Sequence, residues 1–126
     1  MSDNKPYTIT ETANKLGVST HALRYYEQSG LIMPTRSNNR RSFTSADIEW
    51  LEIILLLRDT GMSIRGIREL LNLRQRGFEG MRDRIAYFKA YKTELEQQIM
   101  FRQRAIKTIS HKIEKHTKQL KEYEEK

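Results

Sequence analysis

Six polar side chains fall within two helical turns of residues 19–26, and their chemistry suits contact with DNA. Hydroxyl, imidazole and guanidinium groups near the start of a helix can hydrogen-bond to base edges in the major groove. A guanidinium group and phenol groups can also bind phosphates. The competing interpretation for the tyrosines is that they pack into the core. The six residues are Ser19, Thr20, His21, Arg24, Tyr25 and Tyr26.

A second cationic segment runs from Met33 to Thr44. It contains Arg36, Arg40 and Arg41 and no acidic residue. A basic loop beside a reading helix can straddle the phosphate backbone or enter a minor groove. By itself, the same loop would be an ordinary solvated loop.

The start of a later helix, at Ser63 and Arg65, is a third candidate. Free backbone N–H groups at a helix N-terminus attract anions, so a DNA phosphate is the expected occupant. Ordinary capping by Ser63 is the simpler alternative. The full set of candidate DNA-binding residues is Thr10, Ser19, Thr20, His21, Arg24, Tyr25, Tyr26, Arg36, Asn39, Arg40, Arg41, Ser63 and Arg65.

Catalytic and metal-binding patterns are missing from the sequence. It contains no cysteine, and its three histidines, His21, His111 and His116, are scattered. Disulfides and thiolate metal sites are therefore excluded, and we expect no metal, no other cofactor and no enzyme. The formal charge of +7 favours a polyanionic partner such as nucleic acid. No apolar run is long enough to cross a membrane, so we expect a cytoplasmic protein without a membrane partner.

Helix punctuation in residues 8–30 predicts two short helices joined by a tight turn. Thr8 and Glu11 have the spacing of a capping box, and Gly17 suits the left-handed end of the helix that they open. Ser19 suits the N-cap of the next helix, which we expect to stop at Gly30. Two short helices around a glycine-containing turn predict a helix-turn-helix.

The following residues predict a hairpin and a third helix. Pro34 and the turn residues 37–39 interrupt the helical pattern, which favours a short β-hairpin, or wing. Ser45 is expected to cap the third helix, which should end at residues 60–61. The apolar residues expected on its buried face are Ile48, Leu51, Leu55 and Leu56.

Two further helices complete the predicted fold, with a joint between them at residues 77–80. Ser63 is expected to cap the fourth helix, whose apolar face comprises Ile64, Ile67, Leu70 and Leu71. From Met81 onward, alternating steps of four and three residues mark a heptad stripe that no glycine or proline interrupts. A single helix cannot bury such a stripe, so a partner helix is required. The apolar residues of this seam are Met81, Ile85, Phe88, Leu95, Ile99, Ile106, Ile109, Ile113 and Leu120.

Lys92, Arg102 and His116 are polar residues at seam positions. Either they fix the register and orientation of the paired helices, or they lie where the pair splays apart. The fold class is therefore mainly α: an N-terminal winged helix-turn-helix with a short β wing, then a long C-terminal helix that pairs as a coiled coil. The predicted domains are residues 1–76, which bind DNA, and residues 77–126, the dimerisation helix.

Several short runs of residues occur together in the pattern of one known family. They are Tyr7-Thr8-Ile9, Ala13, Leu16-Gly17-Val18-Ser19, Leu23-Arg24-Tyr25-Tyr26-Glu27, Gly30-Leu31-Ile32, Pro34, Arg41, Phe43, Leu57-Arg58, Gly61-Met62-Ser63-Ile64 and Ile67. With these runs the chain resembles the MerR family of bacterial transcription regulators. The resemblance is close over about residues 7–74, and it extends to the long helix by architecture.

The resemblance implies a homodimer whose long helices pair antiparallel and carry two DNA-binding heads. It implies that the partner is promoter DNA, with a pseudo-palindromic operator in an over-long spacer. Family members bend and untwist this spacer so that RNA polymerase can engage both promoter elements. The resemblance also implies phosphate contacts for Arg24, Tyr25, Tyr26 and Arg41, and a backbone clamp near Ser63.

The chain departs from the family pattern in two places. Family wings commonly run Asn-Gly-Tyr-Arg, whereas residues 38–41 are Asn-Asn-Arg-Arg. Asn39 can still adopt a left-handed conformation, and Arg40 makes the expected wing contact more electrostatic. The third helix is most similar to the aldehyde- and thiol-stress branch, many of whose members have a cysteine near position 56, where this chain has Leu56. Thiol sensing therefore lacks its residue. Metal-sensing members use cysteines after the dimer helix, and since this chain has no cysteine, a soft-metal sensor is excluded. A small-molecule effector is either absent or expected in a small pocket between the heads and the coiled coil.

Two other functions fit the same residues. One is a simple repressor that binds its operator without remodelling the promoter. The other is an adaptor, in which the coiled coil is the functional part and the winged helix binds an acidic protein. DNA affinity and promoter distortion distinguish the three hypotheses.

Overall fold

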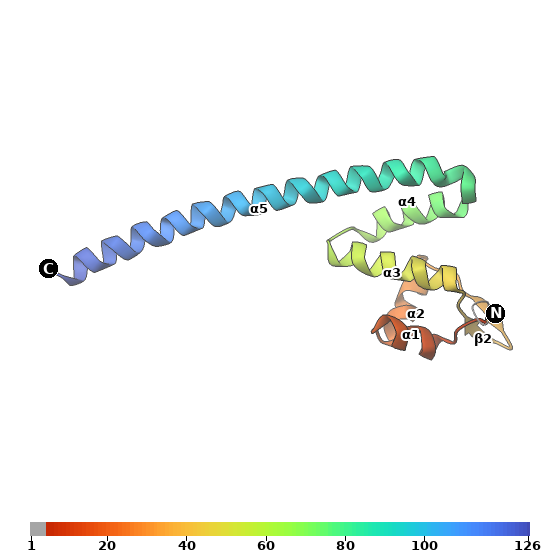
Figure 1. The fold of residues 1–126 in the computed structure, drawn as a ribbon. Coiled ribbons are helices and arrows are strands. Elements are labelled where there is room, and N and C mark those ends of the chain that lie inside the picture. The colour runs from red at the N-terminus through yellow and green to blue at the C-terminus, as the bar shows by residue number, and fades with distance from the viewer. Residues whose placement is uncertain (1–4) are drawn as a thin grey trace. The chain divides into compact units, whose positions relative to one another are not determined.

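The computed structural model describes residues 5–126, so residues 1–4 of the predicted first domain lie outside the described part. The chain divides into two compact units, of which the first ends at Met81 and the second is Arg82–Lys126. The first unit is a helical domain with a two-stranded wing, and the second belongs to one long helix (Figure 1). The elements are α1 (Ile9–Leu16), α2 (Thr20–Gln28), β1 (Thr35–Ser37), β2 (Arg40–Ser42), α3 (Ser45–Asp59), α4 (Ile64–Gln75), η2 (Gly77–Gly80) and α5 (Met81–Glu124).

The predicted helix-turn-helix is confirmed, and its caps are those that the sequence indicates. The Thr8 hydroxyl accepts from the Glu11 backbone N–H at 3.1 Å, and the Glu11 carboxylate accepts from the Thr8 N–H at 2.9 Å. Gly17 ends α1 in the left-handed conformation with φ 70°, which a residue without a Cβ adopts at little cost. Ser19 then caps α2 by accepting from the Ala22 N–H at 3.0 Å. The turn between the helices is therefore only Gly17 to Ser19 long.

The predicted wing is also confirmed. Strands β1 and β2 are antiparallel, and the turn between them places Asn38 at φ 54° and Asn39 at φ 64°. Positive φ at both central residues is the geometry that matches the twist of a two-residue hairpin, and asparagine tolerates it. Beyond the wing, Phe43 exchanges two backbone hydrogen bonds with Tyr7, of 2.8 and 2.9 Å. The segment that precedes α1 is therefore attached to the base of the wing.

The N-cap of α3 differs from the prediction by one residue. The hydroxyl of Thr44, not that of Ser45, accepts from the Asp47 N–H at 3.0 Å. The Asp47 carboxylate in turn accepts from the Thr44 N–H at 3.0 Å. Both residues can cap a helix, but only Thr44 has an acid three positions further on. The corresponding partner of Ser45 would be Ile48, which has no side-chain acceptor.

The predicted buried face of α3 is partly wrong. Ile48 and Leu51 are buried as expected, but Leu56 is 57% exposed. The side chains that α3 buries are Ile48, Trp50, Leu51, Ile54 and Leu57. Because residues 53–57 are all apolar, their hydrophobicity alone could not indicate which side faces inward. The prediction for α4 is largely confirmed, since Ile67, Leu70 and Leu71 are buried.

The predicted joint at residues 77–80 is a short 3-10 helix, η2. Gly80 within it is buried against the end of α4, and a Cβ at this position would lie 2.2 Å from the Leu73 carbonyl oxygen. Since no real side chain tolerates so close a contact with backbone, only glycine fits here. The chain therefore leaves α4 through a turn that depends on a residue without a side chain.

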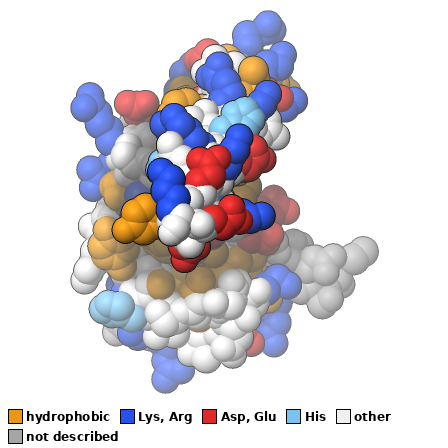
Figure 2. All heavy atoms as spheres, turned by 90° about the vertical axis from the view of Figure 1, so that its left-hand side faces the viewer, with side chains coloured by type: hydrophobic (Ala, Val, Ile, Leu, Met, Phe, Trp, Pro, Cys, Tyr) orange, Lys and Arg blue, Asp and Glu red, His pale blue; other side chains and the backbone are white. Residues whose placement is uncertain are grey.

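The long helix α5 has 44 residues and buries none of the side chains described in it. Along the predicted seam, Ile99 is 55%, Ile106 64% and Ile113 60% exposed. Figure 2 shows hydrophobic side chains that remain uncovered among basic and acidic ones on the face nearest the C-terminus. Within residues 5–126, no helix combines the length and apolarity needed to span a membrane.

The buried hydroxyl of Thr12 provides a test of how the core affects stability. Its side chain on α1 is fully buried, and its hydroxyl has no hydrogen-bond partner among the described residues. Because Thr12→Val removes this unpaired hydroxyl and keeps the shape, we expect the free energy of unfolding to rise by about 1 kcal/mol. A denaturant titration at fixed protein concentration measures the change. Thr10→Val, at an exposed position of the same helix, is the control that should show no gain. A loss of stability in Thr12→Val would contradict the assignment.

Candidate nucleic-acid interface

The exposed face of α2 presents most of the polar residues that the sequence singles out. Leu23 is 1% exposed and anchors the helix in the core. His21 and Arg24 are exposed, whereas Thr20 is half-buried. The Ser19 hydroxyl is already engaged with the Ala22 backbone N–H. The structure therefore leaves His21 and Arg24 as the accessible polar groups in the first half of α2.

The two tyrosines differ in environment. Tyr25 is 48% exposed, whereas Tyr26 is half-buried. Their rings meet edge to face, with 5.7 Å between ring centroids. The structure thus supports both interpretations in part, because Tyr26 packs while Tyr25 remains accessible to a ligand.

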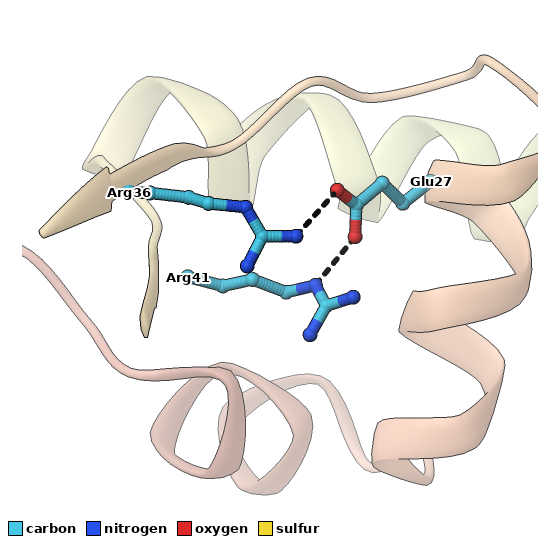
Figure 3. Close-up of polar contacts among 3 residues, drawn as sticks. All are labelled: Glu27, Arg36 and Arg41. Carbon is cyan, nitrogen blue, oxygen red and sulfur yellow. Dashed lines mark hydrogen bonds and ion pairs between the residues drawn. The ribbon is translucent and has the colours of Figure 1, made fainter. Parts of the chain in front are cut away.

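The wing is attached to α2 through Glu27, a residue that the sequence analysis did not single out. Its carboxylate oxygen Oε1 accepts a short hydrogen bond from Arg41 Nε, and Oε2 lies 3.6 Å from a terminal nitrogen of Arg36. Figure 3 shows the carboxylate between the two guanidinium groups, one from each strand of the wing. An acid at the end of α2 followed by an acid-free, arginine-rich hairpin was the sequence signal for this contact.

Arg36 and Arg41 are therefore paired with a carboxylate, whereas Arg40 is not. The side chain of Arg41 is 24% exposed and braces the wing, and that of Arg36 is 50% exposed. Arg40 is exposed next to Asn39 at the turn. Across the described residues, neither Arg24 nor Arg40 forms a side-chain hydrogen bond or an ion pair. These two guanidinium groups are the ones most available to phosphates.

The start of α4 has the cap that the sequence predicts. The Ser63 hydroxyl accepts from the Gly66 N–H at 3.1 Å, so the ordinary capping role is present. The side chain of Arg65 is 91% exposed and lies 3.9 Å from Glu69, which is an open pair on the helix surface. Such a pair contributes little to stability and yields easily to a stronger anion. The remaining candidate, Thr10, is exposed on the first turn of α1.

Helix α4 is attached to the end of α2 by Arg68. Its Nε and one terminal nitrogen donate to the Ser29 carbonyl oxygen at 3.0 and 2.7 Å. A guanidinium group suits this position because the C-terminal end of a helix carries negative partial charge. The Trp50 indole donates to the Leu31 carbonyl oxygen at 2.7 Å, which fixes α3 to the segment after α2. Polar contacts therefore hold the two sides of the candidate interface in place.

A helix-turn-helix whose second helix exposes Arg24, together with a basic wing, defines a winged helix-turn-helix DNA-binding protein. Comparison with known proteins narrows this class. The family described as "MerR HTH family regulatory protein" matches residues 7–74, and the one described as "MerR, DNA binding" matches residues 48–112. The chain belongs to the MerR family of DNA-binding transcriptional regulators.

Individual relatives agree with this assignment. The chain is 28% identical over 109 residues to an HTH-type transcriptional regulator of Haemophilus influenzae, covering 85% of this chain and 81% of the relative. It is 34% identical over 105 residues to the regulator HmrR of Sinorhizobium medicae, covering 82% and 71%. Among solved structures it is similar to HiNmlR, a MerR family regulator lacking the sensor domain, bound to promoter DNA. That match has a TM-score of 0.73 and 28% identity, and covers 86% of this chain and 87% of the other.

Arg24 gives the test of the interface. If its exposed guanidinium group binds a phosphate, Arg24→Ala should weaken binding to operator and random DNA by similar factors. The slope of log K against log salt should become shallower by about 0.9, which is one released counterion. Lys107→Ala, an exposed position on α5 outside the seam, removes the same charge and should leave the slope unchanged. An unchanged slope with a loss of affinity for the operator alone would instead make Arg24 a base-reading residue.

Proposed function

We propose that the chain acts as a homodimer that binds a pseudo-palindromic operator in a promoter spacer and distorts it to control RNA polymerase. The observation that carries this proposal is the uncovered apolar seam of α5, together with the basic face of α2 and the wing. A second copy of the chain is the occupant that we assign to the seam. Its two DNA-binding units, each built from the helix-turn-helix and the wing, then read two half-sites.

The seam supports pairing because apolar residues occupy most of its positions along α5. Six of them, Ile85, Ile99, Ile106, Ile109, Ile113 and Leu120, are each about half exposed or more. Contact between two such stripes removes both from water, which stabilises the pair in proportion to the area buried. Isoleucine or leucine at seven of the seam positions also suits knobs-into-holes packing.

The polar seam residues favour one antiparallel register. In an antiparallel pair each a position lies opposite a d position of the partner. With Lys92 opposite the partner's His116, these two polar side chains share one layer, in which an imidazole nitrogen can accept from the ammonium group. Four of the remaining layers then contain no charged side chain. Shifting one helix of the pair by two heptads in one direction would instead place Lys92 opposite the partner's Arg102 and bury two cations together. The proposed layers are Ile85–Tyr123, Lys92–His116, Ile99–Ile109, Ile106–Arg102, Ile113–Leu95 and Leu120–Phe88.

This register can be tested because the chain contains no cysteine. In the proposed register Ala105 flanks the two-fold axis, so Ala105→Cys should be cross-linked efficiently to its copy by a short bismaleimide. Gln98→Cys is the matched control, since its two copies would be about 12 residues, or roughly 18 Å, apart along the axis. Cross-linking at position 98 and not at 105 would show the two-heptad shift, and a monomer at micromolar concentration would contradict the dimer.

DNA distortion is tested with a labelled operator fragment from the gene's own promoter. We expect binding in the nanomolar range at physiological salt, at least 10³-fold tighter than for random DNA by the usual order of magnitude. Energy transfer between dyes at the two ends should rise on binding, because a bent spacer brings the ends together. Specific binding with unchanged energy transfer would indicate a simple repressor, and equal, weak binding to both DNAs would indicate an adaptor. In vitro transcription with RNA polymerase then measures the direction of control.

A further inference from the structure

Glu27 is the only acidic residue between Thr20 and Thr44, a segment that contains four arginines. It lies in the last turn of α2, between the reading helix and the wing. Both of its carboxylate oxygens are used, one toward Arg41 and one toward Arg36. A single negative charge is thus placed where the predicted DNA face is otherwise positive.

The negative charge of Glu27 offsets a repulsion between two arginines of the wing. Arg36 and Arg41 are direct cross-strand partners in the β1–β2 register. Like charges directly opposite each other destabilise a strand pair, and an acid that binds both relieves the repulsion. Because Glu27 belongs to α2, the same contact also fixes the position of the wing relative to the reading helix (Figure 3).

The two arginines are not equally committed to Glu27. Arg41 donates through Nε, and Figure 3 shows its two terminal nitrogens on the side away from the carboxylate. Arg41 can therefore hold Glu27 and a phosphate at the same time. Arg36 lies 3.6 Å from the carboxylate and its side chain is half exposed, so a phosphate can replace this looser contact.

We propose that Glu27 is a specificity-determining positioning residue for DNA binding, which keeps the wing arginines in one place and lowers their attraction for phosphates elsewhere. The inference rests on the proposed function, because it assumes that α2 and the wing face DNA together. In this proposal Glu27 does not itself contact DNA. Its effect is on which DNA the neighbouring arginines bind.

Affinity for random DNA and affinity for an operator depend on different contacts. Binding to random sequence depends on the number of phosphates that the protein neutralises and on little else. Binding to an operator also requires that base contacts from α2 and phosphate contacts from the wing form in one geometry. Removing the Glu27 charge frees two guanidinium groups and releases the wing, so random binding should strengthen while operator binding gains less.

The test compares Glu27→Gln with the wild-type chain on operator and random duplexes over a range of salt concentrations. We expect the affinity for random DNA to rise about tenfold at low salt, with a slope steeper by roughly 0.9 for each guanidinium group released. The ratio of operator to random affinity should fall about tenfold. Glu114→Gln on α5, exposed and outside the seam, makes the same change in net charge and should leave both quantities unchanged.

A second variant separates position from charge. Glu27→Asp keeps the charge but shortens the side chain by one methylene group, so its carboxylate should no longer hold the wing arginines in place. We expect its salt slope to match the wild type and its operator-to-random ratio to fall. A wild-type ratio in this variant would overturn the positioning role.

Two results with Glu27→Gln would also overturn the inference. One is behaviour identical to Glu114→Gln, and the other is an equal loss of affinity for both DNAs with an unchanged slope, which a merely structural role predicts. Failure of the proposed function is distinguishable from these results, because the wild-type chain itself would then fail to prefer the operator.

Discussion

A helix of 44 residues that buries none of its own described side chains is the constraint on which this protein depends. Its apolar stripe is too regular to be a by-product of composition, and water is a poor environment for it. In the first unit, by contrast, α1 to α4 bury a core of their own around residues such as Leu23, Leu51 and Ile67. The two units therefore differ in how their apolar side chains are covered. The first unit buries them within the chain, whereas those of α5 need a second surface to cover them.

In the first unit, polar contacts hold the segment after α2 in place without engaging Arg24 or Arg40. Arg68 binds the Ser29 carbonyl oxygen, and Trp50 binds the Leu31 carbonyl oxygen, so the segment after α2 is fixed from both α4 and α3. None of these contacts uses Arg24 or Arg40. The two exposed guanidinium groups of Arg24 and Arg40 are therefore separate from the contacts that hold α3 and α4 to the segment after α2.

Local signals made most of this fold predictable from the sequence. The Thr8–Glu11 capping box, Gly17 and Ser19 each act within four residues, so their geometry followed from residue type and spacing. The failures came where a local signal was degenerate: two possible caps stood side by side before α3, and the apolar run 53–57 offered two faces. Glu27 escaped notice for another reason. Its partners lie 9 and 14 residues away, and only the folded hairpin brings them to its two oxygens.

The ion cluster at Glu27 also bears on a conflict that every sequence-specific DNA-binding protein faces. Cations speed association and strengthen binding, but they do so on all sequences equally, and non-specific sites far outnumber the operator. This chain carries a formal charge of +7, which favours the first effect. One carboxylate placed between two wing arginines opposes it at the point where base reading and phosphate contact meet. The looser of its two ion pairs, with the half-exposed Arg36, contributes little to folding stability, and its position beside α2 agrees with a role in selectivity.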